Sequence, residues 1–455
     1  MLDNAVLEDS SFRDPSGAVF YKNNKVFRLV NKTYKKEFDL FVSSGLKKSL
    51  EKKGLIVKSK TVKDNILEVQ KIPFISYPYE WSFSQLKDAA LLTLEVQKQA
   101  LEHNMSLKDA SSYNIQFYKG KPLFIDILSF EKYIDGKPWV GYRQFCQHFL
   151  APLALIVYKD IRLNQLLKVF IDGVPLDLAS KLLPKKTWFD LSFFTHIHIH
   201  SKTQTRFADK ADRVKKYRGS LNKASLLQII DSLENKVKKM NWKIDSTQWG
   251  DYYTFTNYTK SGFDDKKKIV EKYLTRISPK PKLIWDLGAN TGEFSKIAQS
   301  QGAYTIAFDI DPLAVERNYI EQKQKDEKHL LPLLLDITNP SPGIGWSGLE
   351  RKSLINRGPA DCILALALIH HLAITNNVPF SHIAKFISQI TNNGLIIEFV
   401  PKEDSNAKKL LILREDIFPN YTKEDFEKEF SKYFTIIDKK EIKASRRTMY
   451  LMKKI

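Results

Sequence analysis

The segment that most constrains the fold of this chain is an apolar run followed by a glycine-bearing turn, at residues 282–294. It reads K-L-I-W-D-L-G-A-N-T-G-E-F, which predicts a buried strand, a tight turn and the start of a helix. Gly288 and Gly292 allow the backbone to approach a ligand, and the first amides of the helix offer hydrogen-bond donors. The spacing D-x-G-x-x-x-G differs from the dinucleotide pattern G-x-G-x-x-G. It therefore favours a nucleoside with an amino-acid tail, whose ammonium group Asp286 could hold.

Two further apolar runs end in an aspartate. The run Tyr304–Phe308 ends at Asp309, which lies 21 residues after Gly288. An acid in this place is positioned to accept hydrogen bonds from both hydroxyls of a ribose. The run Leu331–Leu335 ends at Asp336, whose carboxylate could accept a hydrogen bond from the exocyclic amine of an adenine. Strands that alternate with helices in this way predict a doubly wound parallel sheet, with a ligand at the carboxyl ends of its strands.

With these residues, the chain from about residue 250 to 455 resembles the class I S-adenosylmethionine-dependent methyltransferases. Within that superfamily, residues 285–292, 336–342 and 397–402 are similar to bacterial methyltransferases of a nodulation-protein-like subgroup. The resemblance implies S-adenosylmethionine as cofactor and a Rossmann-like, seven-stranded α/β sheet whose last strand is antiparallel. It also implies that the cofactor contacts the glycine turn and the strand ends, at Asp286, Gly288, Asn290, Gly292, Asp309, Ile310, Asp336, Ile337 and Ala365. A Rossmann-like domain that no longer binds a cofactor is the alternative.

A fourth apolar run, Asp361–Leu368, leads into a turn that carries His370 and His371. These histidines resemble the His-His-Leu turn of many small-molecule methyltransferases, in which this strand end faces the transferred methyl group. A neutral imidazole there could take the proton of a hydroxyl or an amine. Alternatively, one histidine caps the next helix and the other packs against the cofactor. Upstream, Tyr253 and Tyr258 are candidates for a lid over cofactor and acceptor, because a sulfonium is attracted to aromatic faces, or for ordinary helix packing.

The class of acceptor is suggested by missing motifs and by the charge. The fourth strand end lacks Asp/Asn-Pro-Pro-Tyr and Pro-Cys, which disfavours methylation of the amines or of the C5 carbon of nucleobases. The formal charge of +20 usually suggests nucleic acid, yet only 14 of the 72 basic residues are the arginines that phosphate and base recognition favours. We therefore expect a small-molecule or glycan acceptor, methylated at oxygen or nitrogen. A methyltransferase of RNA, DNA or protein, using the basic N-terminal part, is the alternative.

The N-terminal part mixes strand and helix patterns and predicts a separate α+β domain. Within it, Asp109, Asn114 and Asp126 resemble the catalytic and metal-binding segments of protein-kinase-like and aminoglycoside-phosphotransferase-like folds. The glycine-rich loop of those folds is missing, and Arg28 stands where a lysine is expected. We therefore interpret the three residues as a vestigial nucleotide and metal site, in a module that recognises the acceptor or a partner. A bifunctional methyltransferase with a kinase-like module is the alternative.

The remaining features concern the boundaries and the environment of the protein. We expect an N-terminal domain at 1–200, a basic helical connector at 201–245 and a methyltransferase domain at 246–455. The alternating residues His196, His198 and His200 predict one face of an edge strand, without a bound metal. No apolar run approaches the ~20 residues of a membrane span. The N-terminus lacks a signal-peptide pattern, and both cysteines fit reduced core thiols, so we expect a cytoplasmic protein.

Overall fold

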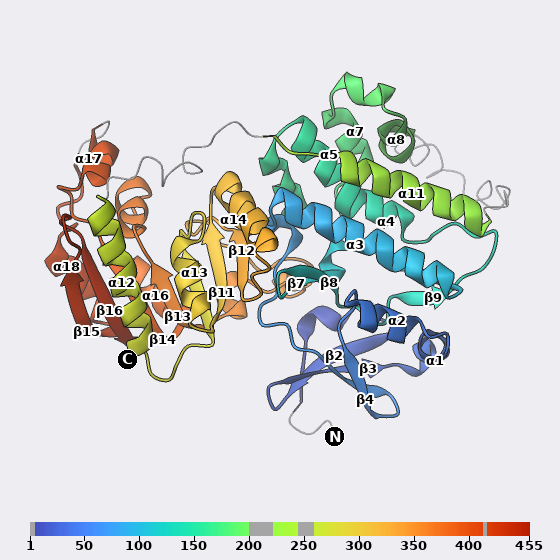
Figure 1. Cartoon of the computed structure of the whole chain (residues 1–455), viewed down its shortest axis with the longest axis horizontal. Coiled ribbons are helices and arrows are strands. Elements are labelled where there is room, and N and C mark those ends of the chain that lie inside the picture. The colour runs from blue at the N-terminus through green and yellow to red at the C-terminus, as the bar shows by residue number, and fades with distance from the viewer. Residues whose placement is uncertain (1–4, 200–221, 244–258, 413–415) are drawn as a thin grey trace. The chain divides into compact units, whose positions relative to one another are not determined.

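The computed structural model describes residues 5–199, 222–243, 259–412 and 416–455, and the chain divides into two compact units (Figure 1). Unit 1 comprises Met1–Lys243 and the later segment Ile344–Arg351. Unit 2 comprises Ile244–Gly343 and Lys352–Ile455. Each unit has its own sheet and its own buried core, and each is described by itself below.

Unit 1 begins with a five-stranded antiparallel sheet. Its strand order is β1 (Val6–Leu7), β2 (Gly17–Lys22), β3 (Lys25–Val30), β5 (Ile66–Val69) and β4 (Ser59–Lys63). The β2–β3 hairpin turns through Asn23 and Asn24, both with positive φ, as a tight two-residue turn between twisted strands requires. Two helices, α1 (Lys35–Ser43) and α2 (Leu46–Lys53), follow β3 before the chain returns to the sheet.

The rest of unit 1 is mainly helical and centres on α3 (Phe83–Glu102). Ser82 caps this helix, since its side chain accepts from the Gln85 amide while the Gln85 side chain accepts from the Ser82 amide. Two short hairpins follow, formed by β6 (Met105–Leu107) with β9 (Phe130–Lys132) and by β7 (Ile115–Tyr118) with β8 (Lys121–Phe124). The remaining α-helices are α4 (Tyr142–Phe145), α5 (Ala151–Tyr158), α6 (Leu166–Val169), α7 (Leu176–Leu182), α8 (Leu191–Phe193) and α11 (Lys223–Lys239).

Helix α11 lies in the stretch that we expected to connect the two domains. It packs along α3, where Lys98 forms ion pairs with Asp231 and Glu234 at 2.6 and 2.8 Å. Its buried face carries Leu226, Ile230, Leu233 and Val237. The helix is therefore part of the core of unit 1, whereas the basic residues 202–218 lie outside the described residues.

The histidine-rich segment is not the predicted strand. Residues Phe194–Ile199 form a helical turn that continues α8, and His200 lies outside the described residues. Asp190 starts this helix by accepting hydrogen bonds from two backbone amides. His198 is buried between the hydroxyls of Ser180 and Thr187, at 2.8 and 3.0 Å. The alternation suggested a strand, but the helix cap and these hydroxyl partners stabilise a helical arrangement instead.

Segment Ile344–Arg351 completes unit 1. Its ends are joined by backbone hydrogen bonds between Ile344 and Arg351, each of 3.1 Å. The Arg351 guanidinium lies over the ring of Tyr113 at 4.4 Å, and the buried carboxylate of Glu350 pairs with Arg13 at 2.8 Å. Ile344–Arg351, which lies far along the sequence, thus contributes contacts to the N-terminal unit.

Unit 2 contains a seven-stranded sheet. Its strand order is β12 (Leu330–Leu334), β11 (Tyr304–Asp309), β10 (Leu283–Leu287), β13 (Ala360–Ala365), β14 (Thr391–Phe399), β16 (Thr448–Lys454) and β15 (Phe434–Glu441). The first five strands are parallel, and β16 runs antiparallel between β14 and β15. This confirms the predicted Rossmann-like sheet with its antiparallel last strand.

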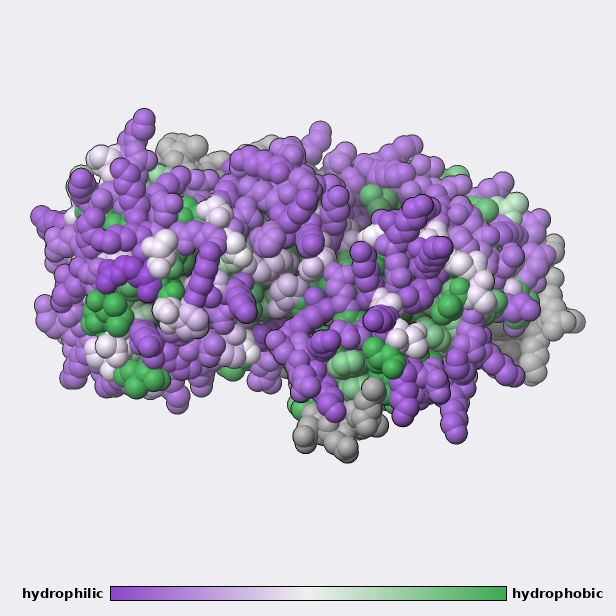
Figure 2. All heavy atoms as spheres, turned by 60° about the horizontal axis from the view of Figure 1, so that its bottom comes forward, coloured by the Kyte–Doolittle hydropathy of each residue, from purple (hydrophilic) through white to green (hydrophobic). Residues whose placement is uncertain are grey.

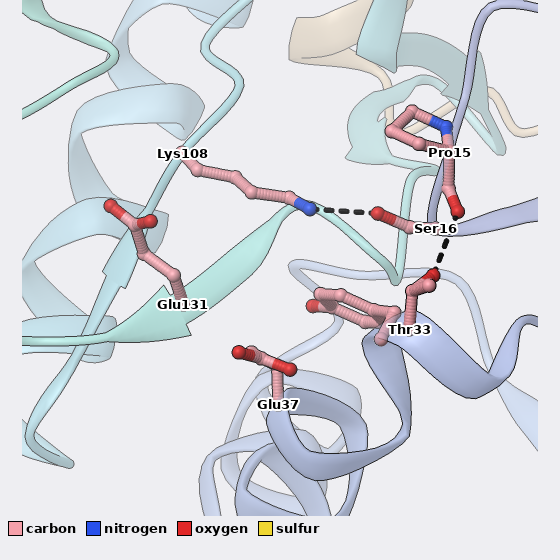
Figure 3. A pocket seen from close by; sticks show the side chains of 7 residues that line it. Pro15, Ser16, Thr33, Glu37, Lys108 and Glu131 are labelled. Carbon is pink, nitrogen blue, oxygen red and sulfur yellow. Dashed lines mark hydrogen bonds between the residues drawn. The ribbon is translucent and has the colours of Figure 1, made fainter.

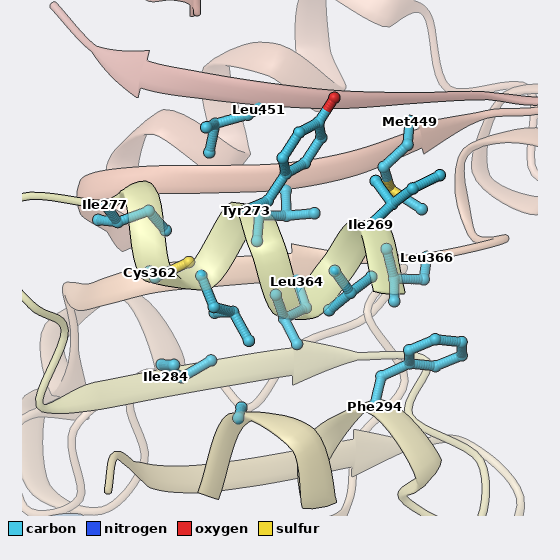
Figure 4. Packing of buried hydrophobic residues seen from close by; sticks show 14 of the residues in the cluster. Ile269, Tyr273, Ile277, Ile284, Phe294, Cys362, Leu364, Leu366, Met449 and Leu451 are labelled. Carbon is cyan, nitrogen blue, oxygen red and sulfur yellow. The ribbon is translucent and has the colours of Figure 1, made fainter. Parts of the chain in front are cut away.

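Helices connect the parallel strands and cover the sheet: α12 (Lys260–Arg276), α13 (Glu293–Ser300), α14 (Pro312–Gln324), α15 (Leu354–Arg357), α16 (Phe380–Ile390), α17 (Ser405–Leu411) and α18 (Lys423–Phe430). Figure 4 shows α12 directing Ile269, Tyr273 and Ile277 toward the strands. They pack against Ile284, Leu364 and neighbouring apolar side chains. This burial fixes β10 and β13 side by side, so their carboxyl ends lie at one edge of the sheet.

Two further expectations can be compared with the structure. Cys146 and Cys362 are both free and buried, as expected of core thiols. No helix within the described ranges is both long and apolar enough to cross a membrane.

Figure 2 shows a mostly hydrophilic face on which apolar residues form small separate patches.

Candidate active site

The glycine turn lies where β10 ends and α13 begins. Gly288, Asn290 and Gly292 have φ values of +76°, +50° and +82°, a conformation that favours glycine and asparagine. A Cβ atom on Gly292 would stand 2.5 Å from Nδ2 of Asn318, so a larger residue fits here only if the Asn318 side chain moves. The turn brings the amino end of α13 to the carboxyl edge of the sheet, where its first amides can face a ligand.

Asp309 ends β11 next to this turn. Its side chain is nearly buried, and the residue is 7% exposed. Oδ2 accepts a hydrogen bond from the Asn290 amide at 2.7 Å, and Oδ1 accepts one from the Asp311 amide at 2.8 Å. Each carboxylate oxygen can accept a second hydrogen bond, so two ribose hydroxyls fit its remaining capacity. Burial raises the pKa of Asp309 to about 6 despite these amides.

Asp286 lies one residue before the end of β10 and is 2% exposed. Its Oδ2 accepts a hydrogen bond from the Ser295 hydroxyl at 2.6 Å. Burial raises the pKa of Asp286 to about 7, although the Ser295 hydroxyl and the nearby Lys266 ammonium lower it. The carboxyl group therefore gains or loses its proton close to neutral pH, and a positively charged ligand group would favour the ionised form.

The remaining predicted cofactor residues also lie at this edge. Ala365 pairs with Leu287 across the β10–β13 ladder. Ile310, directly after Asp309, is an exposed apolar side chain. Asp336 is partly exposed, and its Oδ1 accepts from the amide and the hydroxyl of Thr338 at 2.8 and 2.6 Å. Ile337 is also partly exposed.

The histidine turn follows β13. His370 is 1% exposed, and neither of its ring nitrogens has a hydrogen-bond partner among the described residues. Its ring centroid lies 4.0 Å from that of His371. His370 occupies the N-cap position of the next helical turn but makes no capping hydrogen bond. Burial lowers the pKa of His370 well below its ordinary value, and burial and the Arg447 charge lower the pKa of His371 to about 4. Both rings are neutral at physiological pH.

A buried ion network lies beside these histidines and was not predicted from the sequence. Glu398, near the end of β14, is paired with Lys266 of α12 at 2.7 Å and with Arg447 at 3.4 Å. Arg447 also pairs with Asp404 at 2.8 Å. The signal that could have found it is an acidic residue inside an otherwise apolar strand, because a buried carboxylate needs a cationic partner.

In unit 1, the structure brings together the three residues of the expected vestigial site. The Asn114 side-chain amide donates to the Asp109 backbone oxygen at 3.4 Å. Burial and the charge of Asp126 both raise the pKa of Asp109. Arg28 of β3 binds Asp126 at 2.7 Å and Asp14 at 2.5 Å, so a guanidinium already neutralises the carboxylate expected to hold a metal. In the described part of the chain, no group of three His, Cys, Asp or Glu residues is arranged to hold a metal ion.

A pocket of about 240 Å³ lies next to this site (Figure 3). Lys108, which precedes Asp109, donates to the Ser16 hydroxyl at 2.8 Å and lies 4.3 Å over the Tyr34 ring. Two carboxylates, Glu37 and Glu131, line the same pocket. The candidate lid residues Tyr253 and Tyr258 of the methyltransferase part lie outside the described residues.

Comparison with known proteins identifies the family. Nodulation protein NoeA of Rhizobium meliloti is 36% identical over 461 aligned positions, which cover 97% of this chain and 94% of that protein. The chain belongs to the NoeA family of nodulation proteins. This relationship confirms the nodulation-protein-like subgroup predicted from the sequence. No protein-family model matches the chain.

Solved structures are similar to parts of this NoeA-family chain. The N-methyltransferase NodS of Bradyrhizobium japonicum is 8% identical, covers 43% of this chain and 97% of its own, and has a TM-score of 0.32. Magnesium protoporphyrin IX methyltransferase of Synechocystis is 16% identical, with 43% and 84% coverage and a TM-score of 0.31. The bifunctional kinase-methyltransferase WbdD is 16% identical, with 48% and 45% coverage and a TM-score of 0.30. The sheet of unit 2 has the strand order of the Rossmann-like methyltransferase fold that the sequence predicted.

Proposed function

We propose that this protein methylates an oxygen or nitrogen atom of a small-molecule or glycan acceptor. The observation that carries the proposal is His370, a buried and neutral imidazole without a hydrogen-bond partner in the described residues, at the carboxyl edge that holds the glycine turn. Such a group needs a partner to offset its burial, and an acceptor hydroxyl or amine would supply one. The lysine-rich, arginine-poor charge favours this class of acceptor over nucleic acid.

The residues of the carboxyl edge have distinct roles in this proposal. Bound S-adenosylmethionine supplies an electrophilic methyl group on a sulfonium. The amides after Gly288 and the carboxylate of Asp286 bind its amino-acid tail, and Asp309 accepts from its ribose hydroxyls. Ile310 covers one face of the adenine, and Asp336 accepts from the adenine amine. Residues that held the cofactor in this way would place its reactive end near the histidine turn.

His370 or His371 accepts the proton of the acceptor. An acceptor hydroxyl or amine that took the methyl group from the cofactor's sulfur would give its proton to an imidazole nitrogen of one of these histidines. A base must be unprotonated to do this, and the lowered pKa of both histidines keeps them so at neutral pH. The adjacent rings allow one imidazole to hold the other in place.

Unit 1 is proposed to recognise the acceptor or a partner rather than to transfer phosphate. Phosphoryl transfer depends on charge neutralisation by metal ions and on a loop that covers the phosphates. Here Asp126 is bound by Arg28, the Ser129 hydroxyl and the Leu128 amide, and the β2–β3 turn contains two asparagines. The pocket beside Lys108 offers hydroxyl, cationic and anionic groups, which suit a polar acceptor.

The acceptor class is tested with methyl-labelled S-adenosylmethionine and a fractionated cell extract. We expect label in the small-molecule or glycan fraction, and label only in nucleic acid or protein would contradict the proposal.

His370→Ala and His371→Ala should reduce label transfer, at least one of them by about 100-fold, as loss of a general base does. His382→Ala, an exposed histidine of α16, is the matched control and should leave it unchanged.

The role of unit 1 is tested by thermal unfolding with magnesium-ATP. We expect no rise in melting temperature for the full chain. A rise of several degrees that Asp126→Ala abolishes would show a working nucleotide site and would support a bifunctional enzyme instead.

A further inference from the structure

The chain turns sharply between β13 and the two histidines, at Ala367. This residue has a φ of +52°, in the left-handed region that alanine rarely adopts. A non-glycine residue is held there only when surrounding contacts stabilise the conformation. The contact observed is a hydrogen bond of 2.8 Å from the Ala367 amide to Oε2 of Glu398.

Glu398 is held firmly in its own place. It is 0% exposed. The same Oε2 atom pairs with the ammonium of Lys266 at 2.7 Å, and Oε1 faces the guanidinium of Arg447 at 3.4 Å. Both cations are themselves buried, and Asp404 binds the other side of Arg447. The cluster therefore contains two cations and two carboxylates from four separate parts of unit 2, and its members fix one another's positions.

The histidines follow Ala367 by three and four residues. Backbone hydrogen bonds run from the amides of His371 and Leu372 to the Leu368 oxygen, at 3.0 and 3.3 Å. The direction in which the chain leaves Ala367 therefore decides where both imidazoles point. The charges of Arg447 and Lys266, which hold Glu398, also contribute to the lowered pKa of His370.

We propose that Glu398 is a positioning residue for methyl transfer, which holds the Ala367 turn so that His370 and His371 face the acceptor. Glu398 does not touch the reacting atoms and acts through the Ala367 amide. The inference rests on the proposed function, in which one of these imidazoles takes the acceptor proton. Its structural part, the control of the histidine turn, can be tested without any acceptor.

The test compares two double variants of the full chain. Lys266→Met/Glu398→Gln and Lys266→Met/Glu398→Leu both remove one cation and one carboxylate, and both keep the pair of Arg447 with Asp404. They differ in the polar group at position 398: glutamine retains an amide that can accept from the Ala367 amide and face Arg447, and leucine does not, while Asp404 binds Arg447 in both. Glu398→Asp serves as a further variant because it keeps every charge but shortens the side chain by one methylene.

Three measurements are made on each variant: the dissociation constant of S-adenosylhomocysteine, the NMR signals of the histidine rings, and the rate of label transfer into the acceptor fraction. We expect the glutamine variant to retain the wild-type ring signals of His370 and His371. The leucine variant and Glu398→Asp should shift these signals and transfer label at least about tenfold more slowly. The dissociation constant should change less than about threefold in all of them, and the His382 signal should not move.

Equal ring signals and equal rates in the glutamine and leucine variants would overturn the proposal. If both double variants fail to bind S-adenosylhomocysteine, Glu398→Asp decides: wild-type signals and rate in that variant would equally overturn it. Failure of the proposed function is distinguishable, because the wild-type chain would then transfer no label into the small-molecule or glycan fraction while Glu398 would still control the ring signals.

Discussion

The affinity of the protein for S-adenosylhomocysteine is expected to rise with pH. This ligand carries the same ammonium group and ribose as the methyl donor, and Asp286 and Asp309 must be ionised to bind them well. With a pKa of about 7 for Asp286, about one molecule in eleven is ionised at pH 6 and about ten in eleven at pH 8. This difference contributes about tenfold in affinity. Asp309, with a pKa of about 6, adds about twofold, so we expect about twentyfold tighter binding at pH 8 than at pH 6.

Calorimetric titration at pH 6, 7 and 8 measures this dependence. Asp286→Asn should weaken binding at pH 8 by about 10- to 100-fold, as loss of one charged hydrogen bond does. It should also reduce the pH dependence to the roughly twofold contribution of Asp309. Asp361→Asn is the matched control, because Asp361 accepts from the Lys282 and Leu283 amides at the opposite end of the strands. That variant should keep the full pH dependence.

Two results would refute this reasoning. Equal wild-type dissociation constants at pH 6 and 8 would mean that neither carboxylate faces the ligand's charge or hydroxyls. An Asp286→Asn variant that keeps the full dependence would assign the titration to another group.

Three further predictions concern stability. Because the pKa of Asp286 is raised in the folded state, the contribution of its protonated form to stability is complete at low pH and is lost as pH rises through 7. Asp286→Asn should therefore raise the free energy of unfolding of unit 2, measured in urea, by about 3 kcal/mol more at pH 8 than at pH 5. Arg28→Ala removes the cationic partner of Asp14 and Asp126 and should destabilise unit 1 by about 1–3 kcal/mol. Arg162→Ala removes an exposed arginine of the same unit and should change the unfolding midpoint of unit 1 little. Gly292→Ala should destabilise unit 2 by about 2–4 kcal/mol and weaken S-adenosylhomocysteine binding, because the new Cβ meets Asn318. Gly302→Ala is the control, since Gly302 also has a positive φ but open space around it, and should destabilise unit 2 by only about 1 kcal/mol.

The sheet of unit 2 could be predicted because its signals are local. The apolar run before Asp286, the glycine turn and the acid at 309 each lie within a few residues, and together they define a strand, a turn and a strand end. The spacing of Asp109, Asn114 and Asp126 was informative for the same reason, since a hairpin joins the last two and brings them together. The pairing of Arg28 with Asp126 was less accessible, because Arg28 lies on a strand far away in the sequence.

The ion network around Glu398 could not be predicted in this way. Lys266 and Glu398 come from α12 and β14, and Arg447 directly precedes β16, so no local pattern links them. The histidines at 196 and 198 show the opposite error. Their alternation fits a strand, but side-chain hydroxyls supplied by other elements stabilise a helix, and such partners are absent from any short window of sequence.

The late segment Ile344–Arg351 has a consequence for the order in which the protein folds during its synthesis. Domains usually fold from the N-terminus as they leave the ribosome, at roughly 5–20 residues per second. Unit 1 must wait about 5 to 20 seconds after Lys243 has been made before Arg351 can cover Tyr113 and Glu350 can bind Arg13. During that interval Ile244–Gly343, about half of unit 2, is made, so unit 1 completes its folding only after the synthesis of unit 2 is well under way. A nascent chain arrested before residue 344 should consequently carry an N-terminal unit that proteases open more readily than the same unit in the finished protein.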